Sequence, residues 1–277
     1  MGSAGCILKQ LPHLTMMGNM KTIVRFMICL FLPIFVTVFS ACFGSNRSSE
    51  NEGNIETMTG GILSRIGESQ VTYILPTPKT DGIVSVETAL ANRRSQRNFQ
   101  NRAISAEQLS QILWAAYGIT LPSAVPQLRG GLRTAPSAGA LFPLEVFAIV
   151  GNVEGIAPGV YRYIPDGHKI VRVVDRDVRN ELMEAALGQR MVGAAPASVF
   201  YSAVFGRATG RYGERGVRYV YIELGHSAQN VYLQAEALGL GTVAIGAFID
   251  SRVSQILGLP ANETPLYIMP IGYYYND

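Results

Sequence analysis

Residues 223–248, with the sequence ELGHSAQNVYLQAEALGLGTVAIGAF, join two kinds of structure. The mostly apolar run over residues 219–238 ends directly before Gly239, which predicts one long helix closed by this glycine. Residues 239–248 then carry little bulk, so their backbone can approach a flat ligand closely. A helix end followed by an ordinary packed turn is the other interpretation of this run.

The rest of the chain predicts a mixture of helices and strands. Ser105 and Gln108 form a capping box at the start of an amphipathic helix over residues 105–116. Turn residues 165–167 separate two β-rich runs and indicate a hairpin. The further elements expected are strands over residues 145–150, 160–164, 168–174, 198–205 and 265–272, a helix over residues 175–187, and a helix over residues 250–257 capped by Asp250. Because helices and strands do not alternate regularly, the expected fold class is α+β rather than a doubly wound sheet.

The beginning of the chain predicts a leader. Lys21 and Arg25 precede an apolar run over residues 26–39, and small residues with Cys42 follow it, which is the order of a secretory signal. The residues before Cys42 resemble the lipobox of bacterial lipoproteins, although Phe39 replaces the usual leucine. Acylation of Cys42 would hold the protein stably on a membrane. A signal-anchor helix and a cleaved signal with an incidental cysteine are the alternatives.

Domain boundaries follow from this leader. We expect residues 1–41 to be the signal segment, residues 42–72 to be an acylatable cysteine with a flexible polar tether, and residues 73–277 to be the folded domain. The expected location is therefore a membrane surface facing the periplasm or the cell exterior. Translation can start at Met1 or at Met20.

Composition excludes several function classes for the domain. All three cysteines lie in the first 42 residues, so no disulfide or thiolate nucleophile is expected in the domain, and the three histidines lack metal-ligand spacing. Without Lys9, Lys21 and Arg25, 20 of the 23 basic side chains remain against 20 acidic ones, and this neutrality argues against nucleic-acid binding. Motifs for a serine hydrolase elbow, a Walker A loop and a Rossmann fingerprint are absent from the sequence. Chemistry in this domain would therefore need a bound cofactor.

Two other segments contain candidates for ligand binding. Arg93, Arg94, Ser95 and Arg97 place three guanidinium groups and a hydroxyl within five residues, at the end of a predicted short helix. Guanidinium groups suit phosphate oxygens, which favours an anionic cofactor, whereas the alternative is a solvated basic helix end. Residues 133–143 form a run of small residues before a strand, which suits either a flat ligand or an ordinary loop.

Four motifs in order carry a family resemblance. RRSQRNF (93–99), APSAGALFPLEVF (135–147), residues 223–248 and PLYIMPIGY (265–273) resemble the nitroreductase superfamily of FMN enzymes, and most closely its SagB/ThcOx-type dehydrogenase branch. The resemblance implies an intertwined α+β homodimer with an antiparallel sheet core flanked by helices. It also implies FMN bound non-covalently at the subunit interface.

The resemblance implies a set of cofactor-binding residues. They are Arg93, Arg94, Ser95, Arg97, Pro136, Ser137, Ala138, Gly139, Gly246 and Ala247. The first four would contact the phosphate, the ribityl chain and the pyrimidine edge, and the next four would line the flavin from the partner subunit. The last two would face the ring near N5, where a backbone N–H can hydrogen-bond the atom that exchanges hydride. Arg94 or Arg97 could supply positive charge near N1.

The resemblance also points to candidate catalytic residues. In the azoline-oxidising members of that branch a Lys-Tyr pair before the long helix abstracts a proton, and Arg211 and Tyr212 occupy that place here. Tyr212 is the candidate base, and Arg211 can only assist it electrostatically, because arginine holds its proton far above neutral pH. Packing of Tyr212 in a loop is the alternative. We expect His226 to be a hydrogen-bonded core histidine rather than a catalytic group.

The expected function is hydride transfer between an organic substrate and flavin N5. The reaction would be either that of a SagB-type dehydrogenase or nitroreductase-like, with NAD(P)H as a possible electron donor. Export of the domain favours a donor other than soluble NAD(P)H. The alternatives are a membrane-tethered flavin carrier without turnover, and oxidation of azolines to azoles on a peptide. The expected partners are therefore a small-molecule or peptide substrate, a second copy of the chain, and a membrane.

Overall fold

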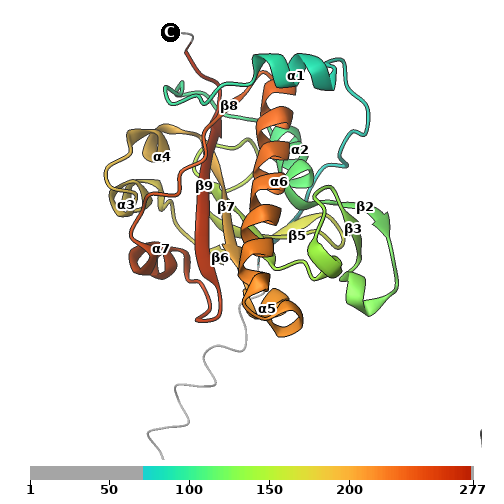
Figure 1. The fold of residues 1–277 in the computed structure, drawn as a ribbon. Coiled ribbons are helices and arrows are strands. Elements are labelled where there is room, and N and C mark those ends of the chain that lie inside the picture. Colours follow the sequence, from blue (N-terminus) through green and yellow to red (C-terminus); the bar gives the residue numbers. More distant parts are fainter. Residues whose placement is uncertain (1–70, 276–277) are drawn as a thin grey trace, which may run out of the picture. The chain divides into compact units, whose positions relative to one another are not determined.

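Seven strands form one antiparallel sheet in the computed structural model, which describes residues 71–275 (Figure 1). Their order across the sheet is β1 (Thr72–Ile74), β6 (Lys169–Val174), β5 (Gly159–Ile164), β4 (Leu144–Val150), β7 (Ala197–Ala203), β9 (Thr264–Gly272) and β8 (Gly241–Thr242). Every neighbouring pair is antiparallel. Strands β2 (Ile119–Pro122) and β3 (Gly131–Arg133) form a separate hairpin. The α+β prediction is confirmed.

Helices cover both faces of this sheet. Side chains of β4 alternate between the faces, so Val146 and Ala148 lie in one apolar core while Phe147 and Ile149 lie in the other. The first core packs against α2 (Ala106–Tyr117) and α6 (Arg215–Ala237). The second packs against α3 (Arg179–Ala185), α4 (Arg190–Ala194) and α7 (Asp250–Leu257). Two short helices, α1 (Val86–Asn92) and α5 (Gly206–Tyr212), lie toward the two ends of α6 (Figure 1).

Elements with local sequence signals formed as predicted. Ser105 caps α2, since its Oγ accepts from the Gln108 N–H at 3.2 Å while the Gln108 side chain accepts from the Ser105 N–H at 3.0 Å. The predicted hairpin corresponds to β5 and β6, with the turn at residues 165–167 between them. Helix α7 ends at Gly258, which adopts the left-handed conformation with φ of 63°.

Several predicted boundaries were wrong. The helix expected over residues 175–187 is shortened to α3, because Leu187 and Gly188 take left-handed conformations that end it, and α4 beyond them was not predicted. Helix α6 begins at Arg215, earlier than predicted, and α5 was not predicted at all. The strand expected over residues 198–205 ends at Ala203. Asp250 is the first residue of α7 rather than its cap, which is Ile249.

The leader prediction falls on residues that the structure does not describe. Cys42, the predicted signal segment and all but the last two residues of the predicted tether lie before residue 71. Within residues 71–275, none of the helices has both the length and the apolar character that crossing a membrane requires.

Candidate functional site

The segment after α1 packs against the edge strand β8. The Gln96 N–H donates to the Thr242 carbonyl at 2.9 Å, and Ser95 forms a parallel bridge with Thr242. Gly241 permits this close approach, since a Cβ at this position would lie 2.6 Å from the Cβ of Gln96 and 2.8 Å from Tyr274. The contact brings the predicted arginine-rich segment to the start of the small-residue run that follows α6.

Tyr232, on the last turns of α6, connects these two segments. Its hydroxyl accepts from the Ala244 N–H at 2.8 Å and lies 3.2 Å from Ser95 Oγ. The Arg93 guanidinium lies over its ring, 5.2 Å from the centroid. Tyr232 was not predicted from the sequence, because a single tyrosine within a helix gives no pattern that reveals contacts so distant along the chain.

The arginines beside Tyr232 keep their charge available. Within residues 71–275, no carboxylate forms an ion pair with Arg93, Arg94 or Arg97. Arg94 donates to the backbone carbonyls of Ala91 and Arg93, at 2.9 and 2.8 Å, and both Arg94 and Arg97 are exposed. Guanidinium groups without carboxylate partners fit the phosphate of a nucleotide-like cofactor.

Gly246 and Ala247 follow Thr242 by four and five residues along the small-residue run. Ile245 pairs with Ile268 of β9 through two hydrogen bonds of 2.9 and 3.0 Å, which fixes the run against the sheet. The next two residues are exposed, and the Ala247 carbonyl accepts from Gln189 at 2.9 Å. We name this assembly the arginine half-site; it consists of Arg93, Arg94, Ser95, Arg97, Tyr232, Gly246 and Ala247.

A second group forms around the loop before β4. Gly139, Ala140 and Phe142 all have positive φ values, of 62°, 54° and 45°. Two of these are not glycine, so the loop backbone is strained. A Cβ on Gly139 would lie 2.6 Å from the Tyr212 hydroxyl and 3.1 Å from Arg211 Nη1, so only glycine admits these side chains.

Tyr212 is positioned by helical rather than loop structure. It is the last residue of α5 and its ring meets that of Tyr219 edge-on, with centroids 5.1 Å apart. The loop placement considered for it was therefore wrong. We name this second assembly the loop half-site; it consists of Pro136, Ser137, Ala138, Gly139, Arg211 and Tyr212.

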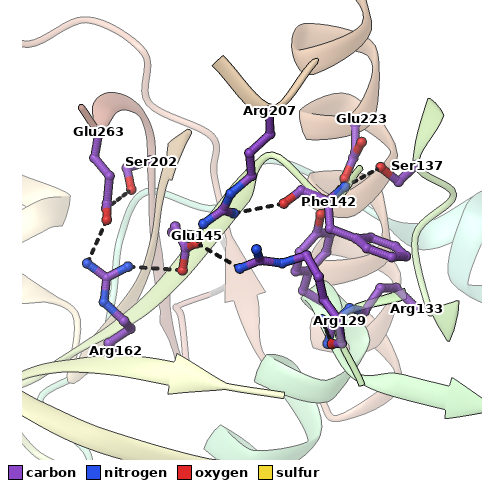
Figure 2. Close-up of polar contacts among 11 residues, drawn as sticks. Arg129, Arg133, Ser137, Phe142, Glu145, Arg162, Ser202, Arg207, Glu223 and Glu263 are labelled. Atoms are coloured by element: carbon purple, nitrogen blue, oxygen red, sulfur yellow. Dashed lines mark hydrogen bonds and ion pairs between the residues drawn. The ribbon is translucent and has the colours of Figure 1, made fainter. Parts of the chain in front are cut away.

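An ion network anchors α5 beside the loop. Arg207 donates to the Phe142 carbonyl at 2.9 Å and to Glu145 of β4 at 2.5 Å (Figure 2). Glu145 also pairs with Arg162 at 2.9 Å, and Arg162 reaches Glu263 at 2.8 Å. The network ties α5, and with it Tyr212, to the loop and to the central sheet.

A buried carboxyl lies behind the loop half-site. Glu223 of α6 is only 2% exposed and accepts a hydrogen bond from the Tyr117 hydroxyl. Burial raises the pKa of Glu223 to about 7, although hydrogen bonds from Ser137 and Tyr117 and the charge of Arg133 oppose this rise. Sequence analysis also missed this residue. Its signal was a carboxylate on the apolar face of α6, beside Val220 and Leu224.

The two half-sites lie at opposite ends of α6. Tyr219, beside the loop half-site, and Tyr232 are 13 residues apart, which corresponds to about 20 Å along a helix. Figure 1 shows α1 and β8 at one end of α6 and α5 at the other. His226, between the two, is exposed on α6, so the expectation of a core histidine was wrong. One chain therefore brings the predicted residues into two groups rather than one.

Comparisons with known proteins agree on one family. Residues 90–273 match the model of the nitroreductase family. A protein of Methanocaldococcus jannaschii, provisionally named a nitroreductase, is 46% identical over 189 residues, which cover 68% of this chain and 91% of that one. The microcin B17-processing protein of Escherichia coli is 28% identical over 151 residues, which cover 52% of this chain and 56% of that one. A solved structure from Ralstonia eutropha, also provisionally named a nitroreductase, is 29% identical with a TM-score of 0.63 and covers 76% of this chain and 93% of that one.

Proposed function

The chain belongs to the nitroreductase family of oxidoreductases, and from this premise we propose that it binds FMN and transfers hydride between an organic substrate and flavin N5. The observation that carries the proposal is the arginine half-site, where three guanidinium groups that have no carboxylate partner within residues 71–275 lie beside the start of the small-residue run. FMN supplies the ring that accepts and returns hydride when it is bound.

Each part of the arginine half-site would have a separate task. Arg93, Arg94 and Arg97 would hold the phosphate and the pyrimidine edge through charge-assisted hydrogen bonds. Tyr232 fixes Ser95 relative to Ala244, and this would set the spacing between the residues that hold the phosphate and those that face the ring. The exposed backbone at Gly246 and Ala247 would face the ring near N5.

A homodimer would complete the site. Along α6, Tyr219 beside Tyr212 lies about 20 Å from Tyr232, and Glu223 beside Ser137 lies about 14 Å from it, so we place the loop half-site against the cofactor of a second subunit. Apolar side chains are exposed on α6, with Tyr221 at 53% and Ile222 at 47%, and on α1, with Leu90 at 53%. Burial of this surface against a second copy would bring the loop half-site of one subunit to the arginine half-site of the other.

The loop half-site supports proton transfer to or from the substrate. The Tyr212 hydroxyl lies against the loop backbone at Gly139, and the Arg211 guanidinium lies beside it. Tyr212 would hold or accept a proton at Oη while hydride moves on the opposite side of the substrate. This arrangement favours a SagB-type dehydrogenase acting on a small molecule or a peptide.

Two narrower functions have specific support. The 46% identity to a protein with a nitroreductase name favours a reaction in which NAD(P)H is the electron donor. The 28% identity to a microcin-processing protein favours oxidation of azolines to azoles on a peptide, although Arg211 replaces the lysine of that chemistry. A donor panel separates them, because only the first reaction bleaches the flavin with NAD(P)H alone.

We also propose a membrane location for the enzyme. The order of positive charges, apolar run and Cys42 supports a signal over residues 1–41 and acylation of Cys42. The polar residues 42–72 support a tether that lets residues 73–277 work outside the cytoplasm. Mass spectrometry of Cys42 peptides from membrane fractions would test the acylation.

The first experiment is the visible spectrum of the purified full chain, with identification of any released chromophore. We expect stoichiometric FMN that bleaches under a reductant and recovers in air. The double variant Arg93→Ala with Arg97→Ala should lower FMN affinity at least about tenfold, because each lost charge-assisted hydrogen bond contributes about 1.5–3 kcal/mol.

The matched control removes the same charge elsewhere. Arg176 and Arg252 form exposed ion pairs with Glu181 and Glu184, so changing both arginines to alanine should leave FMN binding unchanged. Full FMN occupancy in the Arg93/Arg97 variant would contradict the assignment of the arginine half-site. A folded wild-type chain that cannot be reconstituted with FMN would contradict the proposed function.

A further inference from the structure

The carboxyl of Glu223 has no role in the hydride transfer proposed above, yet it is buried behind the loop half-site. Three polar groups face it from three different elements: Tyr117 from α2, Arg133 from the end of β3, and Ser137 from the loop. An ionised carboxyl in a protein interior is unfavourable unless such partners compensate it. The same partners therefore decide whether Glu223 carries a charge.

Ser137 links the carboxyl directly to the strained part of the loop. Its side chain is a hydrogen-bond partner of Glu223, and its Oγ accepts from the Phe142 N–H at 2.9 Å (Figure 2). A serine hydroxyl has one proton to donate, so Oγ can accept from Phe142 while its O–H donates to the carboxylate. Glu223 and Ser137 thus hold the segment that contains Gly139, Ala140 and Phe142 in left-handed conformations.

The positive charge of Arg133 favours the ionised form of Glu223. Its guanidinium lies over the rings of Tyr117 and Phe142, at 5.4 and 5.1 Å from the centroids. Within the described residues its Nε and Nη1 are buried and have no hydrogen-bond partner, while Nη2 donates to the Arg129 carbonyl at 2.8 Å. A negative charge on Glu223 compensates this buried positive charge, and protonation of Glu223 removes the compensation.

We propose that Glu223 is a positioning residue whose ionisation fixes the loop of residues 136–142 in the conformation that lines FMN, so that cofactor binding is linked to proton release. The inference rests on the proposed function, because it concerns the contribution of the loop half-site to the cofactor. As an ionised group, Glu223 accepts hydrogen bonds from Tyr117 and Ser137. When protonated, the Glu223 carboxyl is itself a hydrogen-bond donor and no longer needs the hydrogen bond from Ser137. Loss of that hydrogen bond releases the strained loop of residues 136–142.

The pH range of the effect follows from burial of the carboxyl. Since burial places the pKa of Glu223 at about 7, the loop is released as the pH falls from 8 to 6. FMN affinity of the wild type should therefore weaken over this range. The Glu223→Gln variant resembles the neutral acid at every pH, so its affinity should match that of the wild type at pH 6 and be weaker at pH 8.

The test is a titration of the full chain with FMN, followed by flavin fluorescence, between pH 6 and pH 8. The ratio of wild-type to Glu223→Gln affinity should rise at least about fivefold over this range, which is the lower end of typical coupling between linked sites. The FMN phosphate also ionises near pH 6, but it affects both proteins equally and cancels in the ratio. Glu263→Gln, which alters a buried carboxyl that pairs with Arg162, should give no such rise.

A second variant keeps the test valid if Glu223→Gln does not fold. Ser137→Ala leaves the Glu223 carboxyl in place and removes its hydrogen bond to the loop. The ratio of wild-type to Ser137→Ala affinity for FMN should therefore also rise between pH 6 and pH 8. A constant ratio across the pH range, with normal FMN binding by the wild type, would overturn the inference and leave the proposed function intact. Absence of FMN binding by the wild type at every pH would overturn both.

Discussion

The arginine half-site and the loop half-site lie at the two ends of one helix, yet they are built in opposite ways. The first presents guanidinium groups on a backbone that contacts β8 through one hydrogen bond and an isolated bridge. The second presents small residues on a strained backbone, held from behind by a buried carboxyl. A site that binds a charged phosphate needs available charge, whereas a surface that lines a flat ring needs an exact shape, and shape requires support from the interior.

The largest expected effect is on the free energy of unfolding, because the Glu223 carboxyl that supports the loop half-site is buried. With a pKa of about 7 against an ordinary value of 4.5, Glu223 keeps its proton in the folded chain over a range where the unfolded chain has lost it. Its contribution to stability is fully present below pH 4.5 and is lost as the pH rises through 7, by roughly 3 kcal/mol. In flavin-free protein at pH 8, Glu223→Gln should therefore raise the free energy of unfolding by up to about this amount.

Urea unfolding at pH 5 and pH 8 measures this difference. The two proteins should have similar stability at pH 5, where the wild-type carboxyl is neutral in the folded state. Glu263→Gln provides the contrast, because loss of its ion pair with Arg162 should lower the free energy of unfolding at pH 8. A Glu223→Gln variant that is less stable than the wild type at pH 8 would show that the carboxyl supports the fold rather than the loop conformation.

The second effect tests the close packing of the arginine half-site. In Gly241→Ala the added methyl group would overlap Gln96 and Tyr274, and both contacts involve well-packed parts of their side chains. Overpacking of this kind costs about 2 kcal/mol, and the displaced segment should also lose FMN affinity. Thermal unfolding and FMN titration would measure the two changes.

Gly206→Ala is the control for this substitution. No atom lies within 4 Å of the position that the added methyl group would take at Gly206, so the variant should leave both stability and FMN affinity nearly unchanged. If Gly241→Ala retained wild-type stability and FMN affinity, the contact between residues 93–97 and β8 would not control the site.

The contrast between the half-sites also explains what sequence analysis could predict. Helix α2 was predicted down to its capping box, because Ser105 and Gln108 are neighbours in the chain. Helix α5 was missed, since its sequence contains two glycines and its anchor is the long-range contact of Arg207 with Glu145. Signals between neighbouring residues therefore predicted helices and strands, whereas contacts between residues far apart in the sequence determine where those helices and strands end.

The same division applies to the candidate sites. Arg93, Arg94 and Arg97 were identified because guanidinium groups suit phosphate oxygens and because their short motif resembles that of the nitroreductase superfamily. Tyr232 and Glu223 were not identified, since their roles come from partners 137 and 106 residues away along the chain. Only the folded chain brings such partners together, although the place of Glu223 on the apolar face of α6 was a signal that its carboxyl is buried.

The smallest effect concerns the link within the arginine half-site. Tyr232→Phe removes the hydroxyl that accepts from the Ala244 N–H and contacts Ser95, but it keeps the ring beneath Arg93. Loss of these hydrogen bonds costs about 1 kcal/mol, which corresponds to roughly a fivefold loss of FMN affinity if the bonds set the cofactor's geometry.

Tyr275→Phe is the matched control, because this exposed tyrosine lies outside both half-sites. The pH dependence of FMN binding should stay as in the wild type for Tyr232→Phe, since Glu223 and its loop are unaffected. If Tyr232→Phe lost both FMN affinity and the pH dependence of that affinity, the two half-sites at the ends of α6 would be coupled. Independent losses would instead establish that charge and shape are supplied by separate parts of the chain and meet only at the cofactor.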